Sequence, residues 1–130
     1  MIKTLQFGEK QISFSTNFAW CFIYKSQFHK DPAHVVVPAA KQIMADGGIN
    51  DPYDAFEIIG FVEAANIAWS MARLANPDTP DPETWITSIA DDFDLVEIML
   101  DLIPDAINSC FSTKKSKAPI PPAEKAAPKK

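Results

Sequence analysis

The chain has 130 residues, of which 47% are hydrophobic and 22% are charged, and its formal net charge at pH 7 is −5. This length supports one hydrophobic core and excludes two full domains. The sequence has neither the roughly 20 consecutive apolar residues that cross a bilayer nor the apolar core of a signal peptide. We therefore expect a soluble, intracellular protein without a membrane partner.

Charge is distributed unevenly along the chain. Residues 1–111 carry six Lys or Arg and sixteen Asp or Glu, whereas residues 112–130 carry six Lys and a single acid, Glu124. The terminal segment also holds four prolines, which cannot donate backbone hydrogen bonds, and its lysines repel one another. We predict one folded domain at 1–111 and a flexible Pro/Lys/Ala tail at 112–130.

The first seventeen residues have the alternation of apolar and polar side chains that is typical of a β-hairpin, with a turn at Gly8-Glu9-Lys10. An isolated hairpin is only marginally stable, so it needs helices to pack against. Thr16 or Asn17 is a suitable N-cap for a first helix that ends at about Phe28.

A second helix is predicted to begin at Asp31-Pro32, because a capping residue followed by proline is a frequent helix start. Pro38 either kinks this helix or begins the next one, and Gly47-Gly48 ends the segment. The longest periodic segment then runs from Asp51-Pro52 to Asn76-Pro77. Its interior is apolar on almost every face, so we predict a central core helix; a partly exposed self-association surface is the alternative.

Two shorter helices complete the predicted fold. One begins at Asp81-Pro82 and ends at about Ala90, and the last begins near Asp92 or Asp94 and is interrupted by Pro104. The predicted fold class is α+β and mostly helical. An N-terminal β-hairpin is followed by four to five helices and a disordered basic C-terminal tail.

Motifs for catalysis or metal binding are not found. His29 and His34 lie on either side of Asp31-Pro32, which a helix does not straddle smoothly, so we interpret them as solvated loop residues and not as a metal pair. Cys21 and Cys110 have apolar neighbours and no CxxC spacing, so we interpret them as small buried side chains. No GxSxG motif or Gly-rich phosphate loop occurs. We predict a non-enzymatic protein without a metal or cofactor.

An acidic field covers residues 74–113, where nine Asp or Glu occur without a single Lys or Arg. Such a surface repels nucleic-acid phosphates and attracts basic partners or the protein's own tail. Acids at helix starts explain part of the field, because they interact favourably with the helix dipole. They do not explain Glu97, Asp101 and Asp105, which we take as candidate partner-binding residues. Paired carboxylates for acid/base chemistry are the enzymatic alternative.

Large aromatic side chains are the candidates for anchoring a partner's helix in a groove. The five candidates are Phe18, Trp20, Tyr24, Trp69 and Trp85. We expect at least half of them to belong to the core. The apolar residues of the long helix also exceed what a core of about 110 residues buries, so we expect a homo-oligomer.

Three stretches, taken in order, carry a resemblance to a known family. They are MIKTLQFGEKQISFSTNFAWCFIYKSQF, WSMARLANPDTPDPETWITSIADDFD and LVEIMLDLIPDAINSCFSTKK. A strand, turn, strand and helix at the start, and an acidic helix with a Lys-containing tail at the end, resemble the tail assembly chaperones of long-tailed, siphovirus-type bacteriophages that infect Gram-positive bacteria. The proline-containing segment 31–38 departs from that pattern.

The resemblance implies a non-enzymatic chaperone that binds the tape measure protein and helps the tail tube protein assemble around it. It places the protein in the host cytoplasm and not in the mature virion. It also implies a ribosomal frameshift near the end of the gene that makes a scarcer, longer product, and the closing residues 127–130 are compatible with slippery codons. The alternative from another class is an acidic DNA-mimic inhibitor of a nucleic-acid-binding protein, against which the positively charged tail argues.

Overall fold

The N-terminal β-hairpin predicted from the alternating pattern is confirmed. In the computed structural model, which describes residues 1–46 and 51–111, strand β1 (Ile2–Phe7) pairs antiparallel with β2 (Lys10–Ser15), and Phe7 lies opposite Lys10. The turn between them needs glycine, because Gly8 has a φ of 63°. A Cβ at Gly8 would also collide with the Asp92 carboxylate. The hairpin turn therefore lies directly against the acidic segment of the chain.

Helices make up most of the remaining described chain, so the predicted fold class is confirmed. The elements are α1 (Trp20–Phe28), α2 (Ala33–Asp46), α3 (Pro52–Ile59), α4 (Phe61–Ala75), α5 (Pro82–Ile89), the 3-10 turn η1 (Ala90–Asp92), α6 (Leu95–Glu97), the π-turn η2 (Ile98–Leu102) and α7 (Ile103–Phe111). The predicted helix stop at Gly47-Gly48 and the predicted tail at 112–130 lie outside the described residues.

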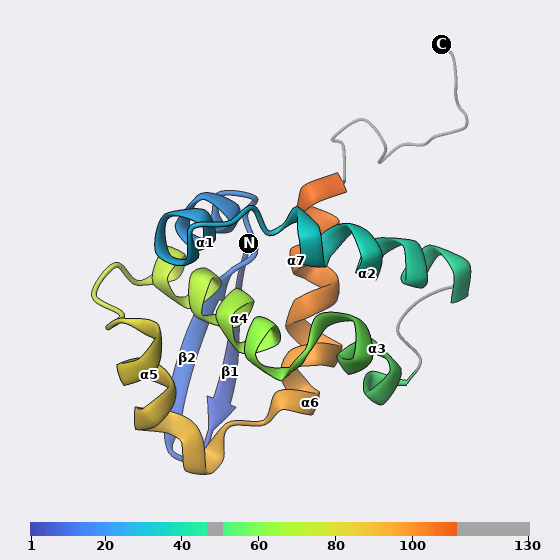
Figure 1. Cartoon of the computed structure of the whole chain (residues 1–130). Coiled ribbons are helices and arrows are strands. Elements are labelled where there is room, and N and C mark those ends of the chain that lie inside the picture. Colours follow the sequence, from blue (N-terminus) through green and yellow to red (C-terminus); the bar gives the residue numbers. More distant parts are fainter. Residues whose placement is uncertain (47–50, 112–130) are drawn as a thin grey trace.

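Helix α4 occupies the centre of the molecule and packs against β2 and α1 (Figure 1). Ala64, Ala68 and Ala72 recur at helical spacing, and all three are fully buried. Small side chains on one face of a helix allow its neighbours to approach closely. The prediction of a central core helix is therefore correct for α4.

Four aromatic rings fasten the hairpin to the helices. Phe7 and Phe14 from the two strands pack against Phe93 and Trp85, and the ring centroids of the contacting pairs are 5.5 to 6.5 Å apart. Phe14 has no exposed surface, and Phe7 has 1%. Such pairs add to the free energy of apolar burial, so this cluster anchors the hairpin to α5 and to the start of α6.

The long helix predicted between Asp51 and Asn76 is wrong in one respect, because it is two helices. Gly60 has φ 86° and ψ 154°, a conformation that is essentially restricted to glycine, and α3 and α4 meet there at 83°. The apolar pattern runs through Gly60 without a change, and one glycine costs a helix only about 1 kcal/mol. Local pattern therefore did not reveal the bend.

The two internal prolines have different effects. Helix α2 continues through Pro38, so neither a new helix nor a break occurs at this position. At Pro104 the predicted interruption takes the form of the π-turn η2, which immediately precedes α7. Proline lacks the N–H that would bond to Leu100, and a wider turn accommodates its ring.

No described helix is by itself long and apolar enough to cross a membrane. Helices α3 and α4 reach that length and composition only when they are counted together, and the bend of 83° separates them.

Candidate partner-binding surface

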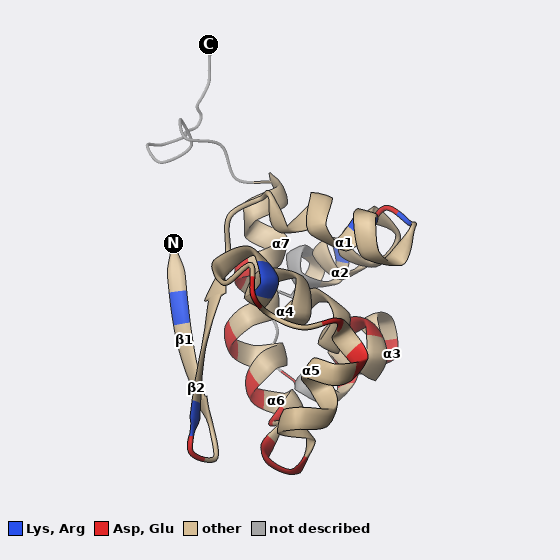
Figure 2. Cartoon of the chain, turned by 90° about the vertical axis from the view of Figure 1, so that its left-hand side faces the viewer, with Lys and Arg blue, Asp and Glu red and all other residues tan. Residues whose placement is uncertain are grey.

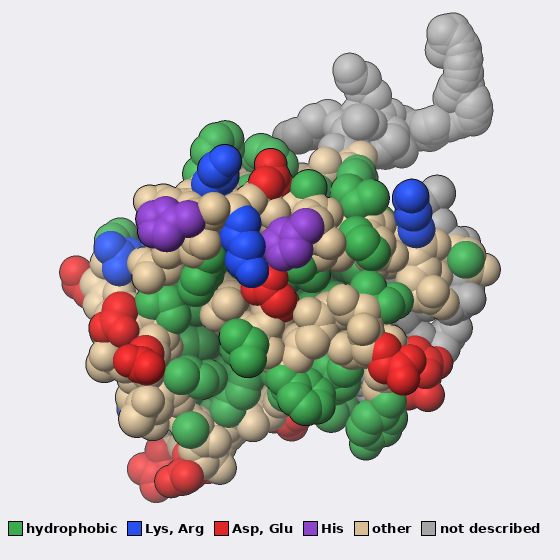
Figure 3. Space-filling view, in the orientation of Figure 1, with side chains coloured by type: hydrophobic (Ala, Val, Ile, Leu, Met, Phe, Trp, Pro, Cys, Tyr) green, Lys and Arg blue, Asp and Glu red, His purple; other side chains and the backbone are tan. Residues whose placement is uncertain are grey.

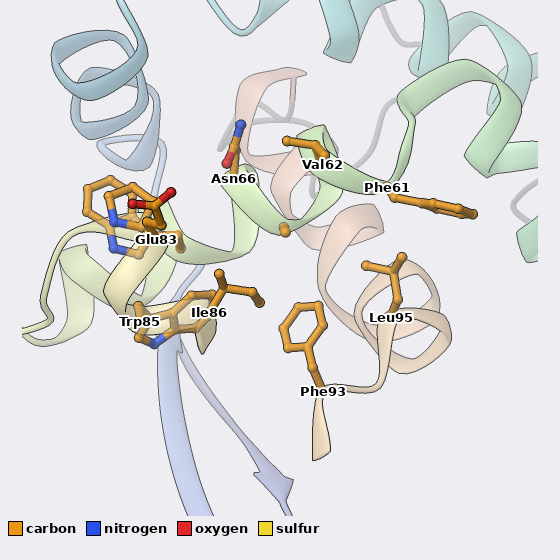
Figure 4. Close-up of a pocket in the computed structure, with 11 residues that line it drawn as sticks. Phe61, Val62, Asn66, Glu83, Trp85, Ile86, Phe93 and Leu95 are labelled. Carbon is orange, nitrogen blue, oxygen red and sulfur yellow. The ribbon is translucent and has the colours of Figure 1, made fainter. Parts of the chain in front are cut away.

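An apolar groove of about 430 Å³ lies between α4, α5 and the segment that leads into α6 (Figure 4). Val62 and Phe61 reach it from the start of α4, Ile86 from α5, and Phe93 and Leu95 from the chain that follows η1. These side chains come from three elements and border the same space in Figure 4. Gly60 separates α3 from α4, so Phe61 and Val62 are the first two residues of α4 and lie at the edge of the groove.

A second hollow of about 370 Å³ lies at the bend itself, lined by Tyr53, Phe56, Glu57, Gly60 and Phe61. Phe61 lines both spaces, so the groove and the hollow adjoin. We call them together the apolar trough. Figure 3 shows apolar side chains spread over the lower half of this face, between α5 and α3.

The trough exposes large apolar side chains to solvent. Phe61 is 65% exposed, and Tyr53 and Val62 are each 71% exposed. Single exposed apolar residues are ordinary, but contiguous ones beside a groove are typical of an interaction surface. The trough is therefore the strongest candidate binding surface in the described part of the chain.

Acidic residues border the trough. Glu83 lines the groove and Glu57 lines the hollow, whereas Asp92 lies against the hairpin turn and Asp94 caps α6. Figure 2 shows acidic residues on α3, on α5, on α6 and on the turn η1 between α5 and α6. Among the described residues that line the groove or the hollow, none is Lys or Arg. A ligand of the trough should therefore be apolar with basic flanks.

The five aromatic candidates are distributed between core and surface, and four are buried. Trp20 and Tyr24 have no exposed surface; the Trp20 Nε1–H donates to Ser109 Oγ at 3.0 Å, and the Tyr24 hydroxyl donates to Glu63. These two therefore belong to the core and are not presented to a partner. Trp69 and Trp85 are 2% and 5% exposed and line the inner side of the groove, whereas Phe18 is 48% exposed on the turn before α1.

The acidic candidates Glu97, Asp101 and Asp105 do not line the trough. Asp105 pairs with the Lys3 ammonium of β1 at 2.8 Å, and the same ammonium donates to the Asp101 backbone carbonyl at 2.8 Å. Glu97 is half-buried, and its pKa is raised by burial and then by the charges of Asp101 and Asp94. Asp105 thus ties the hairpin to α7, a role that no local pattern indicates because Lys3 is distant in sequence.

A polar network around Glu63 was not predicted. Its carboxylate accepts from the Tyr24 hydroxyl at 2.7 and 2.9 Å, lies 2.9 Å from His34 Nε2, and accepts from Asn66 Nδ2 at 3.3 Å. Lys30 adds an ion pair at 3.5 Å. Burial opposes ionisation of Glu63, but these hydrogen bonds and the Lys30 charge outweigh it and lower its pKa. The network joins α1 and α2 to α4.

The histidine interpretation needs one correction. His29 is a terminal residue of α1 in the left-handed conformation, with φ 62°, as a loop residue would be. His34 instead lies in the first turn of α2, where it contacts Glu63. In the described ranges 1–46 and 51–111, no three His, Cys, Asp or Glu side chains gather as a metal site requires.

The two cysteines also differ from the sequence interpretation. Cys21 and Cys110 are only half-buried, and their Sγ atoms lie 3.6 Å apart. Their positions in the chain are 89 residues apart, so sequence spacing carried no signal of this contact.

Comparison of the chain with protein-family models, with curated proteins and with solved structures found no match.

Proposed function

We propose that this protein is a non-enzymatic chaperone that binds an amphipathic helix of a client protein in the apolar trough. The observation that carries the proposal is the exposure of Phe61, Val62 and Tyr53 beside a groove of about 430 Å³. An amphipathic helix places apolar residues at positions i, i+3, i+4 and i+7, and such a row of side chains fits an elongated apolar groove.

The lining of the groove argues for a helix over a small metabolite. Pockets for small molecules combine apolar lining with several polar groups that fix the orientation of the ligand. Among the described residues that line the groove, only Asn66 and Glu83 have an amide or a charged side chain. A surface of this kind recognises apolar shape, and its acidic border selects a helix with basic flanks.

The sequence resemblance suggests which client this chaperone would bind. We propose that the client is the tape measure protein of a long-tailed phage, and that the chaperone keeps its helices soluble while the tail tube protein assembles. The chaperone would act in the host cytoplasm and would be absent from the mature virion. A longer form made by ribosomal frameshift would carry the same trough, because the shared region includes residues 51–95.

Without a client, an exposed trough favours self-association. We propose that a second copy covers the trough, so that the free protein is a homo-oligomer. The client helix would then dissociate the oligomer by competing for the same surface. Sedimentation with and without a client peptide tests this competition.

The DNA-mimic alternative is less well supported. Asp81 and Asp94 accept hydrogen bonds from the backbone N–H of Thr84 and Glu97, as helix caps, and Asp105 pairs with Lys3. Acids held in caps and internal pairs are less able to reproduce a row of phosphates. A competition assay on a DNA-binding enzyme would have to show inhibition for that function to stand.

The proposed function is tested with a synthetic amphipathic peptide that has Leu on one face and Lys on its flanks, and with helical segments of the tape measure protein encoded in the same genome. Val62→Glu places a charge in the trough, so we expect it to weaken binding by about tenfold or more, or about 1.4 kcal/mol. Fluorescence anisotropy of the labelled peptide measures the dissociation constant.

The matched control is Leu100→Glu, because Leu100 is 43% exposed and does not line the trough. Equal loss of binding in the two variants, or a scrambled peptide that binds as well as the amphipathic one, would refute the trough as the binding site. Binding of the synthetic peptide but of no tape measure segment would leave a helix-binding protein with a different client.

A further inference from the structure

The two cysteines form a dithiol that the proposed function does not use. Cys21 lies in the first turn of α1 and Cys110 in the last turn of α7, with 3.6 Å between their Sγ atoms. Both line a hollow of about 240 Å³ between α1, α7 and the start of α2, together with Phe22 and Val37. A small reagent in this hollow would reach both sulfur atoms.

The residues next to the two cysteines hold them in position. Trp20 precedes Cys21 and is fully buried, and its Nε1–H donates to the hydroxyl of Ser109, which precedes Cys110. The Ser109 hydroxyl in turn donates to the Ala106 carbonyl at 2.6 Å. The contact between α1 and α7 is therefore fixed by a buried side chain at the level of the thiols, and the two sulfur atoms stay adjacent.

We propose that Cys21 and Cys110 are a redox modification site that closes into an intramolecular disulfide when a low-molecular-weight disulfide such as glutathione disulfide enters the hollow. Adjacent sulfur atoms make the second step of thiol–disulfide exchange intramolecular, which favours the closed product over two separate mixed disulfides.

The chemistry balances without any further reactant. The Cys110 thiolate attacks one sulfur of glutathione disulfide and expels one glutathione thiolate, which leaves a mixed disulfide on Cys110. The Cys21 thiolate then attacks the Cys110 sulfur and expels the second glutathione. The two protein thiols lose two electrons and two protons in total, and the oxidant is reduced to two molecules of glutathione.

The electrostatics of the pair favour Cys110 as the first nucleophile. A hydrogen bond shared with the Cys21 thiol lowers the pKa of Cys110 to about 7, against the opposing effects of burial and of the Asp31 charge. The same hydrogen bond, together with burial, raises the pKa of Cys21. A thiolate is the reactive form in exchange, so a proton shared between the two sulfur atoms favours one thiolate in the pair, and we assign the first attack to Cys110.

Closure would join α1 to α7 across 89 positions of the chain. A crosslink over a loop of that size restricts the unfolded chain strongly, so we expect the thermal midpoint to rise by roughly 5 to 15 °C. The end of α7 would also be fixed to the N-terminal part of the fold.

The test uses the full chain with excess glutathione disulfide. We expect mass spectrometry under non-reducing conditions to show the loss of two hydrogen atoms, a thiol assay to show no free thiol, and the thermal midpoint to rise and then return on reduction. Cys21→Ser and Cys110→Ser each retain one thiol, so each should take up one glutathione and show no such rise.

Three results would overturn the proposal: both thiols remaining free in excess oxidant, two glutathione adducts on one chain, or a disulfide between two chains. A closed disulfide with an unchanged thermal midpoint would overturn the expected stabilisation by the crosslink between α1 and α7. None of these results depends on the trough, so the dithiol and the client-binding function can fail separately.

Discussion

The hairpin side and the trough side of the molecule use the same kinds of side chain in opposite ways. Phe7 and Phe14 on the hairpin are covered by Trp85 and Phe93, whereas Phe61 on the trough is 65% exposed. Both regions are rich in aromatic residues, and they differ in whether neighbouring elements cover the rings. Whether aromatic side chains form a core or an exposed surface here is therefore decided by the elements packed around them and not by residue type.

The largest expected effect comes from truncating one phenylalanine on each side. Phe14→Ala removes a ring with no exposed surface, so we expect the free energy of unfolding to fall by about 3–5 kcal/mol. Phe61→Ala removes a mostly exposed ring whose centroid lies 5.2 Å from that of Phe56, so we expect a loss below about 1 kcal/mol.

Urea unfolding measures the stability of both variants. In the peptide-binding assay we expect the opposite order, with the larger effect at Phe61. Phe61→Ala should weaken helix binding more than Phe14→Ala weakens it in the folded fraction, because Phe14 touches the groove only from behind, through Trp85. Both variants are compared at a protein concentration at which sedimentation shows a monomer, because the proposed homo-oligomer would cover Phe61. Similar losses of stability in the monomer would mean that Phe61 contributes to the core.

The second prediction concerns the bend between α3 and α4 that borders the trough. Apart from Gly60 itself and its two neighbours in the chain, no described atom lies within 4 Å of the position that a Cβ would take at Gly60. Gly60→Ala is therefore opposed only by backbone strain at φ 86° and should cost about 1–3 kcal/mol. Relief of that strain requires α3 and α4 to change their angle, so helix binding should fall as well.

Gly8→Ala is the matched control, because Gly8 has φ 63° and lies on the hairpin side against Asp92. It should lower stability without changing the angle between α3 and α4, so its loss of peptide affinity should be smaller than that of Gly60→Ala. If Gly60→Ala keeps full affinity, the trough does not depend on the bend.

Sequence reasoning succeeded where the signal is local. Asp51 accepts from the Tyr53 N–H at 2.9 Å and Asp81 from the Thr84 N–H at 3.2 Å, which are the caps that these two Asp-Pro steps predicted. At the third Asp-Pro step, Asp31 accepts from the Ala33 N–H at 2.8 Å. The hairpin was predictable for the same reason, because alternation and a glycine turn lie within fifteen residues.

The candidate site was only partly predictable. Trp69 and Trp85 were identified as possible anchors and do line the groove. Val62 was expected only as part of the excess apolar surface of the long helix, and Phe61, which is 65% exposed, was not identified. Their exposure depends on an angle at Gly60 and on the position of α5, which are set by tertiary packing and leave no periodic trace in the sequence. The same holds for Cys21 and Cys110.

The third prediction concerns the polar network around Glu63 of α4. Glu63→Gln removes the charge that Tyr24, His34 and Lys30 surround, so we expect a loss of about 1–3 kcal/mol near neutral pH. The pKa of Glu63 is lowered on folding, so its contribution is present above the unfolded value of about 4.3 and is lost as pH falls through the lower folded value.

The difference in thermal midpoint between wild type and Glu63→Gln should therefore shrink as pH decreases below about 4. Other carboxylates titrate in both proteins, so the difference isolates Glu63. A gap that stays constant down to about pH 3 would show that the variant loses packing and not charge.

The smallest expected effect lies on the hairpin side, at the ion pair between Lys3 and Asp105. The two side chains are 33% and 29% exposed, so water screens the 2.8 Å contact and we expect Lys3→Met to cost about 0.2–1 kcal/mol. Methionine keeps most of the apolar stem of the side chain, so the loss reports on the ammonium. Lys10→Met is the control, because Lys10 donates to the Ser88 carbonyl at 3.3 Å.

Salt separates the two interactions of Lys3. At about 1 M salt the screening length falls to about 3 Å, so a coulombic contribution from Asp105 should nearly disappear, whereas the hydrogen bond to the Asp101 carbonyl should persist. We therefore expect the cost of Lys3→Met to fall in high salt to the level of Lys10→Met, as measured by urea unfolding at both salt concentrations. A cost that does not change with salt would assign the role of Lys3 to the carbonyl, and the acidic field would then contribute nothing to holding the hairpin in place.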